Sequence, residues 1–413
     1  MPVEQGYWRY VEGVAAQVCR LYGYQRIDTP IFEETSLFAR SVGESTDIVE
    51  KEMYSFQDRG GGGLTLRPEG TAAICRAYLE HGMHNLPQPV RLHYLGPIFR
   101  YERPQAGRYR QHQQLGCEAI GEQDAAVDVE IVNLAWRFLH RLGLGNLVLY
   151  LNSVGCPRCR PGYLVVLKDH YEPHLASLCP ECRTRFHRNP LRLLDCKKDS
   201  CQPVADGAPP MLDYLCDSCA PHFQVVREGL EMLGIPFQSN HRLVRGLDYY
   251  TKTVFEIQPG GGGAQSTIAG GGRYDGLIEE LGGRPTPGVG FATGIERIIL
   301  NLKSQGVALP NPHASPIFVA YLGEAARRDA LKLLEDLRQG GIAAVSAFGD
   351  RSLKAQLRQA NALGVSHTLI LGEEELKTGT VLLRTMAQGK QERVPREAVL
   401  SVAREGSLPL RGD

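Results

Sequence analysis

The chain has 413 residues and carries 46 basic against 46 acidic side chains, so its formal net charge at neutral pH is zero. This balance excludes a cationic field over the whole molecule, and any nucleic-acid contact must use local patches. Apolar residues make up 43% of the chain, enough material for the cores of roughly two or three domains. The sequence has no apolar run near the ~20 residues of a membrane helix and no apolar signal core. We therefore expect a cytoplasmic protein that does not contact membranes.

The N-terminal part predicts a helix followed by two strand-like segments. Apolar residues recur at helical spacing from Tyr7 to Leu21, and the pattern stops at Gly23. The segment RIDTPIFEE that follows alternates like a β-strand, in which Pro30 marks an edge or a bulge. Further on, LTLRPEGT predicts a strand that enters a helix, and its Thr71 is placed to cap the helix.

The stretch from Phe99 to Gly121 is the richest in chemistry. It begins with four arginines in eleven residues, against one acid, Glu102. The flanking segments have strand composition, and a proline and a glycine between them predict a hairpin or a long strand–loop–strand. Guanidinium groups match phosphate oxygens in pairs and stay charged at any physiological pH, which favours a polyphosphate ligand. The alternative is a solvated basic loop.

The eleven cysteines are unevenly distributed. Three of them stand alone in apolar surroundings, and we expect them to be packed, inert thiols: Cys19, Cys75 and Cys117. The other eight lie in a cysteine-rich segment, residues 156–223, which we interpret as an insertion. They form three pairs with two intervening residues and one looser pair: Cys156/Cys159, Cys179/Cys182, Cys216/Cys219 and Cys196/Cys201. In a reducing compartment this spacing suits structural Zn²⁺ sites for one or two ions, and the alternative is a region that folds without metal.

Glycine is concentrated between Pro259 and Gly272. We interpret this segment as a turn that feeds a strand, in which Gly270–Gly272 let a ligand approach the backbone closely. The tip of the hairpin, Gly260–Gly263, has the composition of a flexible turn.

The C-terminal part has a different pattern. After a linker at residues 311–316, strands and helices alternate, which predicts a small α/β domain with a largely parallel sheet. Arg351, Lys354 and Arg358 recur at three- and four-residue spacing. They suit contact with RNA phosphates, or they form a solvated helix face.

Four segments, in order, resemble motifs of one enzyme family. Residues 99–121 resemble motif 2 of the class II aminoacyl-tRNA synthetases, and GVGFATGIERI at 288–298 is similar to motif 3. RGLDYYT at 245–251 and GGGRYDGL at 270–277 resemble the two histidine-specific motifs of the histidyl-tRNA synthetase family. Four motifs in the family's order are a specific signal, whereas a lone glycine run would be weak.

The resemblance implies an α+β fold. Residues 1–310 would form the class II catalytic core, an antiparallel sheet flanked by helices, with the cysteine-rich insertion at 156–223. Residues 316–405 would form an anticodon-binding α/β domain. RIDTPIFEE resembles motif 1, which implies a homodimer. The strand that usually precedes the first helix in the family is absent from this sequence. Either the start of the chain was assigned downstream of the true start, or the edge that forms the dimer is trimmed.

The resemblance also implies an activity and its residues. The family activates L-histidine with ATP to histidyl-adenylate and pyrophosphate, then transfers histidine to the 3′ end of tRNA(His). Arg100 and Arg245 would be catalytic, on the α-phosphate and the reacting carboxylate. ATP, with Mg²⁺, would be bound by Arg100, Glu102, Arg108 and Arg297. Histidine would be bound by Glu69, Gly70, Thr71, Gln114, Glu118, Tyr249 and Tyr250.

Two other functions are weighed against this one. The first is a catalytically inactive paralogue that acts as the regulatory subunit of ATP phosphoribosyltransferase. That paralogue generally lacks the C-terminal domain and degrades the histidine motifs, whereas Arg245, Tyr249 and Tyr250 are present here. The second is a zinc-stabilised RNA-binding module, which the cysteine pairs permit but which leaves the predicted pocket residues unexplained.

Overall fold

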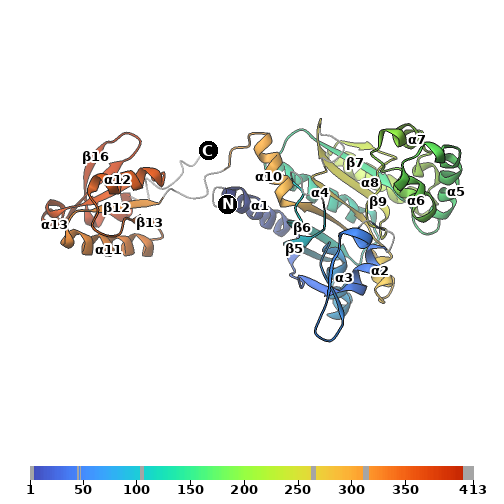
Figure 1. Cartoon of the computed structure of the whole chain (residues 1–413), viewed down its shortest axis with the longest axis horizontal. Coiled ribbons are helices and arrows are strands. Elements are labelled where there is room, and N and C mark those ends of the chain that lie inside the picture. The colour runs from blue at the N-terminus through green and yellow to red at the C-terminus, as the bar shows by residue number, and fades with distance from the viewer. Residues whose placement is uncertain are drawn as a thin grey trace. The chain divides into compact units, whose positions relative to one another are not determined.

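The computed structural model describes residues 4–43, 46, 48–102, 107–261, 267–309 and 316–402. The chain divides into two compact units, one ending at Ala308 and the other beginning at Leu309 (Figure 1). Among the described residues, no helix combines the length and the apolar character needed to cross a membrane.

An eight-stranded sheet forms the centre of the first unit. Its strand order is β1-β5-β6-β11-β10-β9-β7-β8. The strands are β1 (Gln25–Arg26), β5 (Val90–Phe99), β6 (Gln111–Ile120), β11 (Gly288–Gly294), β10 (Ala269–Arg273), β9 (Thr251–Pro259), β7 (Leu147–Ser153) and β8 (Phe237–Ser239). All pairs are antiparallel except β1–β5 and β7–β8 at the two edges. The predicted antiparallel class II sheet is therefore confirmed, including the strand–loop–strand of β5 and β6.

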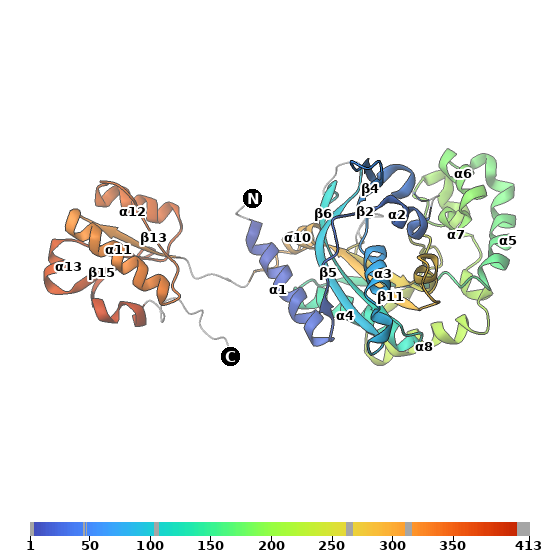
Figure 2. The same ribbon diagram turned by 90° about the horizontal axis from the view of Figure 1, so that it is seen from below.

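Four helices cover one face of this sheet (Figures 1 and 2). They are α1 (Gln5–Leu21), α4 (Ala125–Arg141), α8 (Cys219–Met232) and α10 (Ile295–Ser304). The predicted first helix is confirmed as α1, which buries Val11, Val18 and Cys19. Its predicted stripe was wrong at Leu21, which is 61% exposed. At 3.6 residues per turn, Leu21 lies nearly opposite Cys19 and faces away from the core.

A buried ion pair ties this helical layer to the sheet. Asp128 of α4 and Arg273 at the end of β10 are both 0% exposed, and the Arg273 Nε donates to Asp128 Oδ2 at 3.0 Å. His222 of α8 contacts the same carboxylate, Nε2 to Oδ1, at 3.2 Å. Burial would raise the pKa of Asp128, but His222 and Arg273 hold it below its ordinary value.

The predicted strand at RIDTPIFEE was wrong as a single element. It divides into β1, in the large sheet, and β2 (Phe32–Glu34), in a three-stranded sheet of order β2-β4-β3. The other members of that sheet are β4 (Gly63–Leu66) and β3 (Tyr54–Gln57). Pro30 lies between the two pieces, where a residue without an N–H cannot continue a ladder.

The opposite face of the large sheet carries the remaining helices of the first unit and the insertion. The short elements before the insertion are α2 (Thr35–Val42), the π-turn η2 (Ile48–Glu52), α3 (Thr71–Glu80) and η3 (Met83–Asn85); α9 (Leu277–Glu280) follows β10. The insertion leaves the core after β7 and returns into α8. It contains α5 (Arg160–Tyr171), η4 (Glu172–Ser177), α6 (Pro180–Arg188), η5 (Pro190–Leu193), η6 (Asp199–Cys201), α7 (Gln202–Asp206) and η7 (Met211–Tyr214).

The second unit is a five-stranded sheet of order β13-β12-β14-β15-β16 with helices against it. Its elements are β12 (Ile317–Tyr321), α11 (Glu324–Gln339), β13 (Ala344–Ser346), α12 (Leu353–Ala362), β14 (His367–Leu371), α13 (Glu373–Thr378), β15 (Thr380–Thr385), β16 (Gln391–Pro395) and η8 (Arg396–Ala398). The α/β alternation is confirmed, but the prediction of a largely parallel sheet was wrong for half of the pairings. β14–β15 and β15–β16 are antiparallel, because a hairpin closes the sheet. Of the predicted linker, residues 311–315 lie outside the described residues.

Candidate functional site

A cavity of ≈ 290 Å³ lies on the face of the large sheet opposite α4. It collects side chains from the start of α3, from β6 and the segments beside it, from the RGLDYYT segment, and from β10, β11 and α10. All but one of the predicted site residues line it: Glu69, Thr71, Arg100, Glu102, Arg108, Gln114, Glu118, Arg245, Tyr249, Tyr250 and Arg297. Gly70 does not line the cavity. Its ideal Cβ would lie 2.3 Å from the Tyr94 ring, so only glycine lets this wall close.

The start of α3 presents a carboxylate to the cavity. The prediction that Thr71 caps this helix was wrong, because the N-cap is Gly70. The side chain of Glu69 instead accepts hydrogen bonds from the backbone N–H of Thr71, at 2.7 Å, and of Ala72, at 2.8 Å. Burial raises the pKa of Glu69, and these two N–H donors oppose the rise.

Glu118 is the second buried carboxyl group, in the middle of β6. It accepts hydrogen bonds from the Thr71 hydroxyl at 2.7 Å and from the Tyr274 hydroxyl at 2.6 Å. Burial raises its pKa to about 8, against the effect of the two hydroxyl donors. The raised pKa favours the neutral form of this carboxyl group.

Tyrosines make up the walls around Glu118. The rings of Tyr249 and Tyr250 lie 4.8 Å apart between centroids, and Tyr274 lies 5.8 Å from Tyr249. The Tyr94 hydroxyl donates to Gln114 Oε1 at 2.6 Å. Sequence reasoning assigned no role to Tyr94 or Tyr274. Two features of the sequence could have indicated them. The alternation of side chains along β5 places Tyr94 on the face of the sheet that carries the cavity, and Tyr274 lies within the GGGRYDGL motif.

The other end of the cavity is lined by guanidinium groups. Arg100 Nε donates to the Pro68 carbonyl at 2.7 Å, and Arg297 Nη1 donates to the Thr267 carbonyl at 2.7 Å. Arg108 pairs with Glu102 at 3.3 Å. The pKa of Arg297 is lowered first by burial and then by the like charge of Arg108 and Arg100. Such crowding of cations favours a multiply charged anion between them.

Arg245 lies between the two ends, in an ion pair with Glu256 of β9. Glu256 also accepts from the Thr267 hydroxyl at 2.7 Å. Gly270 lies opposite Glu256 in the β10–β9 register, and its ideal Cβ would lie 2.7 Å from Arg245 Nη1. The group that closely approaches Gly270 is therefore an arginine of this chain, and the approach of a ligand to Gly270–Gly272 stays a prediction. The Arg245 Nε is buried with no hydrogen-bond partner among the described residues. Sequence reasoning missed Glu256, whose role depends on the strand register.

Comparison with known proteins agrees with this geometry. A family model described as histidyl-tRNA synthetase matches residues 2–158 and 211–298, more than half of the chain. The chain belongs to the histidyl-tRNA synthetase family. A model described as an anticodon binding domain matches residues 316–406.

Curated proteins and solved structures resemble the chain over nearly its whole length. A histidine–tRNA ligase of Dehalococcoides mccartyi is 59% identical over 401 residues, which cover 97% of this chain and 96% of that protein. One of Pelotomaculum thermopropionicum is 53% identical, with 98% and 95% coverage. The apo histidyl-tRNA synthetase structure of Staphylococcus aureus shares 38% identity, with a TM-score of 0.81 and coverage of 97% and 96%. A Bacillus halodurans structure titled as an ATP phosphoribosyltransferase regulatory subunit/histidyl-tRNA synthetase shares the fold, at 22% identity and a TM-score of 0.64.

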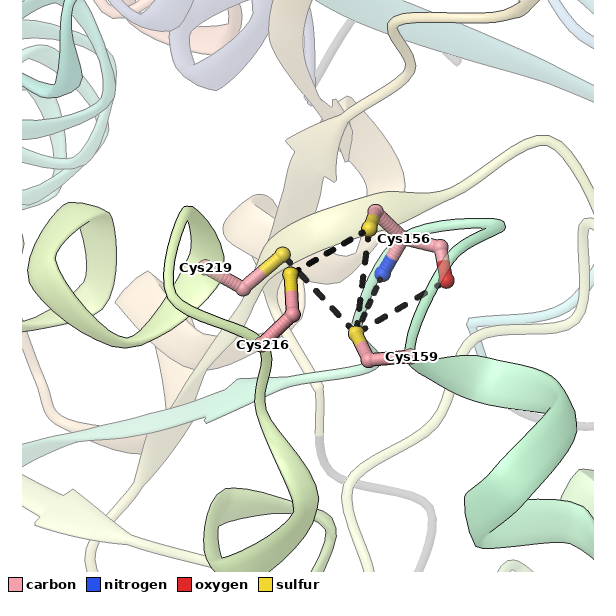
Figure 3. Close-up of side chains that lie close together, drawn as sticks. All are labelled: Cys156, Cys159, Cys216 and Cys219. Atoms are coloured by element: carbon pink, nitrogen blue, oxygen red, sulfur yellow. Dashed lines mark hydrogen bonds between the residues drawn. The ribbon is translucent and has the colours of Figure 1, made fainter.

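The histidyl-tRNA synthetase model leaves residues 159–210 unmatched, a range inside the cysteine-rich insertion. The structure resolves the eight clustered cysteines into two groups of four. The neck cluster is Cys156, Cys159, Cys216 and Cys219, and the lobe cluster is Cys179, Cys182, Cys196 and Cys201. Figure 3 shows the neck cluster, in which one pair from each of two chain segments faces the other.

Both clusters fit a tetrahedral metal ion. Within each, the four Sγ atoms lie within 4.8 Å of one another. Four thiolates at the ~2.3 Å of a Zn–S bond define a tetrahedron with edges of about 3.8 Å. The Sγ atom of Cys156 lies 3.7 Å from that of Cys159 and 3.8 Å from that of Cys216. In the lobe cluster the Sγ atoms of Cys179 and Cys196 are 3.9 Å apart. Cys19, Cys75 and Cys117 are buried outside these clusters, as predicted.

Proposed function

We propose that this chain is a histidine–tRNA ligase that couples ATP cleavage to the activation of histidine and then charges tRNA(His). The observation that carries the proposal is one cavity with two chemically different ends. One end gathers guanidinium groups suited to a triphosphate, and the other surrounds two buried carboxyl groups with tyrosines. Membership of the histidyl-tRNA synthetase family supports the same activity.

The guanidinium end would bind ATP. Arg100 and Arg245 would stabilise the negative charge that builds on the α-phosphate as the histidine carboxylate attacks and pyrophosphate leaves. Arg108 and Arg297 would hold the outer phosphates, and Glu102 would accept from the adenine amino group. Mg²⁺ bound with ATP would neutralise the leaving pyrophosphate. The buried Nε of Arg245 supports its role, since it is a donor with no acceptor in the part of the chain that the structure describes.

The tyrosine end would bind histidine. Glu69, Thr71 and Gln114 would receive the ammonium group, and Gly70 would keep this wall narrow. Glu118 and Tyr250 would pair with the two imidazole nitrogens, with Tyr249 beside them. A pocket built to pair polar groups rejects an analogue without them by ~10⁴–10⁵, because its own buried groups would be left unpaired.

The second step would transfer histidine to the 3′-hydroxyl of tRNA(His). The match to an anticodon binding domain at residues 316–406 supports tRNA as the partner. We propose that a phosphate oxygen of the adenylate accepts the hydroxyl proton. A side chain whose loss abolishes transfer but leaves adenylate formation intact would contradict this assignment.

We also propose Zn²⁺ as a structural metal of the insertion. Closed sites of four thiolates leave no open coordination position, so the metal would stabilise the fold and take no part in the reaction. Thiols held in such constellations suit a reducing compartment, and we propose the cytoplasm as the place of action.

A homodimer is proposed from an exposed apolar patch on the three-stranded sheet. Ile31, Phe32 and Phe56 are 46%, 51% and 45% exposed, and the two phenylalanine rings lie 6.4 Å apart. Apolar side chains gathered at one exposed place favour burial in an interface. Replacement of Phe32 and Phe56 by Ser is expected to shift the sedimentation coefficient from dimer to monomer. A wild-type chain that sediments as a monomer at micromolar concentration would argue against the dimer.

Histidine-dependent exchange of pyrophosphate into ATP tests the proposed activity. The full chain is expected to catalyse exchange with L-histidine and to charge tRNA(His), while other amino acids, including glutamine and tyrosine, support no exchange. An inactive regulatory paralogue would show no exchange with any amino acid. The intact pocket and the match at residues 316–406 weigh against that alternative.

A further inference from the structure

The neck cluster lies where the insertion leaves the catalytic core and returns to it. Cys156 and Cys159 follow β7, and Cys216 and Cys219 precede or begin α8. The Sγ atoms of Cys159 and Cys219, one from each segment, lie 3.9 Å apart. Figure 3 shows the four thiol groups close together, so an ion at their centre would hold the two segments together at the base of the insertion.

The lobe cluster lies within the insertion itself. It joins the start of α6, at Cys179 and Cys182, to the segment that ends at η6, at Cys196 and Cys201. The Cys179 backbone N–H donates to Cys201 Sγ at 3.3 Å, a contact that suits a thiolate ligand. This second site closes a loop of the insertion and contains no residue of the catalytic sheet.

Arg160 connects the neck cluster to the pocket. It follows Cys159 directly and donates from Nε to the Val154 carbonyl at 3.1 Å and from Nη2 to the Tyr250 carbonyl at 2.5 Å. The two residues before Cys156 also pair with Lys252, which lies just after the RGLDYYT motif: the Val154 N–H donates to the Lys252 carbonyl and the Lys252 N–H donates to the Gly155 carbonyl, each at 2.8 Å. Tyr250 lines the cavity.

The lobe cluster reaches the same motif and the residues before it through side chains: Arg242 Nη2 donates to the Cys196 carbonyl at 3.2 Å. Asn189, at the end of α6, donates to the Asp248 carboxylate at 2.7 Å. Asp248 does not line the cavity, and the contact involves its side chain instead of the backbone that carries Tyr250. The two clusters therefore differ in how directly they hold the pocket wall.

We propose that the chain holds two Zn²⁺ ions, one in each cluster, and that the ion in the neck cluster positions the Tyr249–Tyr250 wall of the pocket through Arg160. The first part stands on the thiol geometry alone. The second part rests on the proposed function, in which Tyr250 contacts histidine, and it makes Arg160 a positioning residue that does not touch the substrate.

Metal analysis of the purified full-length chain tests the first part. Two zinc ions per chain are expected, and one per chain in each of two matched variants, Cys156→Ser/Cys216→Ser for the neck and Cys182→Ser/Cys196→Ser for the lobe. Cys19→Ala, a buried cysteine outside both clusters, is expected to retain two. A wild-type chain with one zinc ion or none, or a loss of both ions in both variants, would overturn the assignment of two independent sites.

Hydrogen–deuterium exchange and kinetics test the coupling. The neck variant is expected to exchange faster at residues 248–254 and to raise the KM for histidine by about 10-fold, of the same order as the loss of activity when an outer-shell partner of a metal site is removed. The KM for ATP is expected to change much less. In the lobe variant the exchange rate at residues 248–254 and the KM for histidine are expected to stay near those of the wild type. Equal effects of the two variants on the histidine KM would overturn the special role of the neck.

Arg160 variants keep the test decisive even if a cysteine variant fails to fold. Arg160→Ala is expected to retain two zinc ions yet to show faster exchange at residues 248–254 and a raised histidine KM, and Arg160→Lys is expected to restore part of both. Unchanged exchange and KM in Arg160→Ala would refute the coupling. If the chain had no ligase activity, zinc content would still test the two metal sites, and hydrogen exchange would still test the coupling of the neck cluster to the Tyr249–Tyr250 wall. Failure of the proposed function can therefore be distinguished from failure of this inference.

Discussion

The pocket and the insertion are ordered by different physical means. In the pocket, side chains from distant parts of the sequence are aligned by strand register and fastened by buried hydrogen bonds, such as Tyr274 to Glu118. The insertion has no strands and consists of short helices and 3₁₀ turns around two clusters of four thiols. Strand register can therefore align the side chains of a pocket, whereas a region of short helices gains most from coordination bonds.

The largest expected effect comes from breaking the anchor beneath the sheet. Asp128→Asn removes the fully buried counter-charge of the Arg273 guanidinium and leaves it only the partly exposed Asp275, 3.1 Å away, which is expected to cost up to ~3–5 kcal/mol of unfolding free energy. Urea unfolding of the full chain measures the shift, and zinc content is expected to stay at the wild-type value. Asp28→Asn is the control, because Asp28 and its partner Arg26 are 67% and 58% exposed, and its expected cost is under ~1 kcal/mol. Equal shifts in the two variants would contradict the anchor role.

Removal of the central cation of the pocket should act on the reaction and leave the fold intact. Arg245→Ala is expected to slow histidine-dependent exchange by ~10²–10³-fold, since a fixed donor at the developing charge is lost. The KM for ATP is expected to change little, and Arg245→Lys to recover only part of the rate because the ammonium cannot replace the guanidinium fork. A rate within a few-fold of the wild type would count against the assigned role.

The buried carboxyl of the pocket should make stability depend on pH. The pKa of Glu118 is raised to about 8 in the folded chain, above its unfolded value, so its contribution is fully present at low pH and is lost as pH rises towards about 8. The stability of the wild type relative to Glu118→Gln is therefore expected to decrease as the pH rises from the unfolded pKa of a glutamate to about 8. The decrease is up to about 1.4 kcal/mol of unfolding free energy per pH unit. Denaturant titrations from acid to pH 8.5 measure it. A difference independent of pH would show that Glu118 is ionised in the folded chain.

A smaller effect is expected from filling space beside Glu118. The ideal Cβ of Gly290 would lie 1.8 Å from Glu118 Oε2, so Gly290→Ala is expected to cost ~1–3 kcal/mol through overpacking. Gly294 lies at the end of the same strand with nothing within 4 Å of its ideal Cβ. Gly294→Ala is expected to cost less than ~1 kcal/mol. Thermal unfolding of the pair separates local crowding from the general effect of replacing glycine in β11.

The sequence predicted helices and strands correctly where the element depends on one residue type or on a short spacing of apolar residues. The periodicity from Tyr7 predicted α1, and the arginine-rich hairpin predicted β5 and β6. It was less successful where a single segment had two destinations. RIDTPIFEE has the alternation of one strand, yet its two ends pair with different sheets, and no local signal distinguishes these outcomes. Thr71 is a residue type that often caps helices, but the helix begins at Thr71 itself, and Glu69 accepts hydrogen bonds from its first two N–H groups.

The amino-acid sequence alone determined the chemistry of this chain: guanidinium groups for phosphates, acids and tyrosines for a polar ligand, and thiols in pairs. These properties belong to side chains and to short spacings, so they survive without knowledge of the fold. Only the tertiary structure decided which groups meet. It paired Arg245 with Glu256 across two strands, surrounded Glu118 with Thr71 and Tyr274, and sorted eight cysteines into two sets of four. Such meetings depend on strand register and on how chain segments cross, which are set by packing between residues far apart in the sequence.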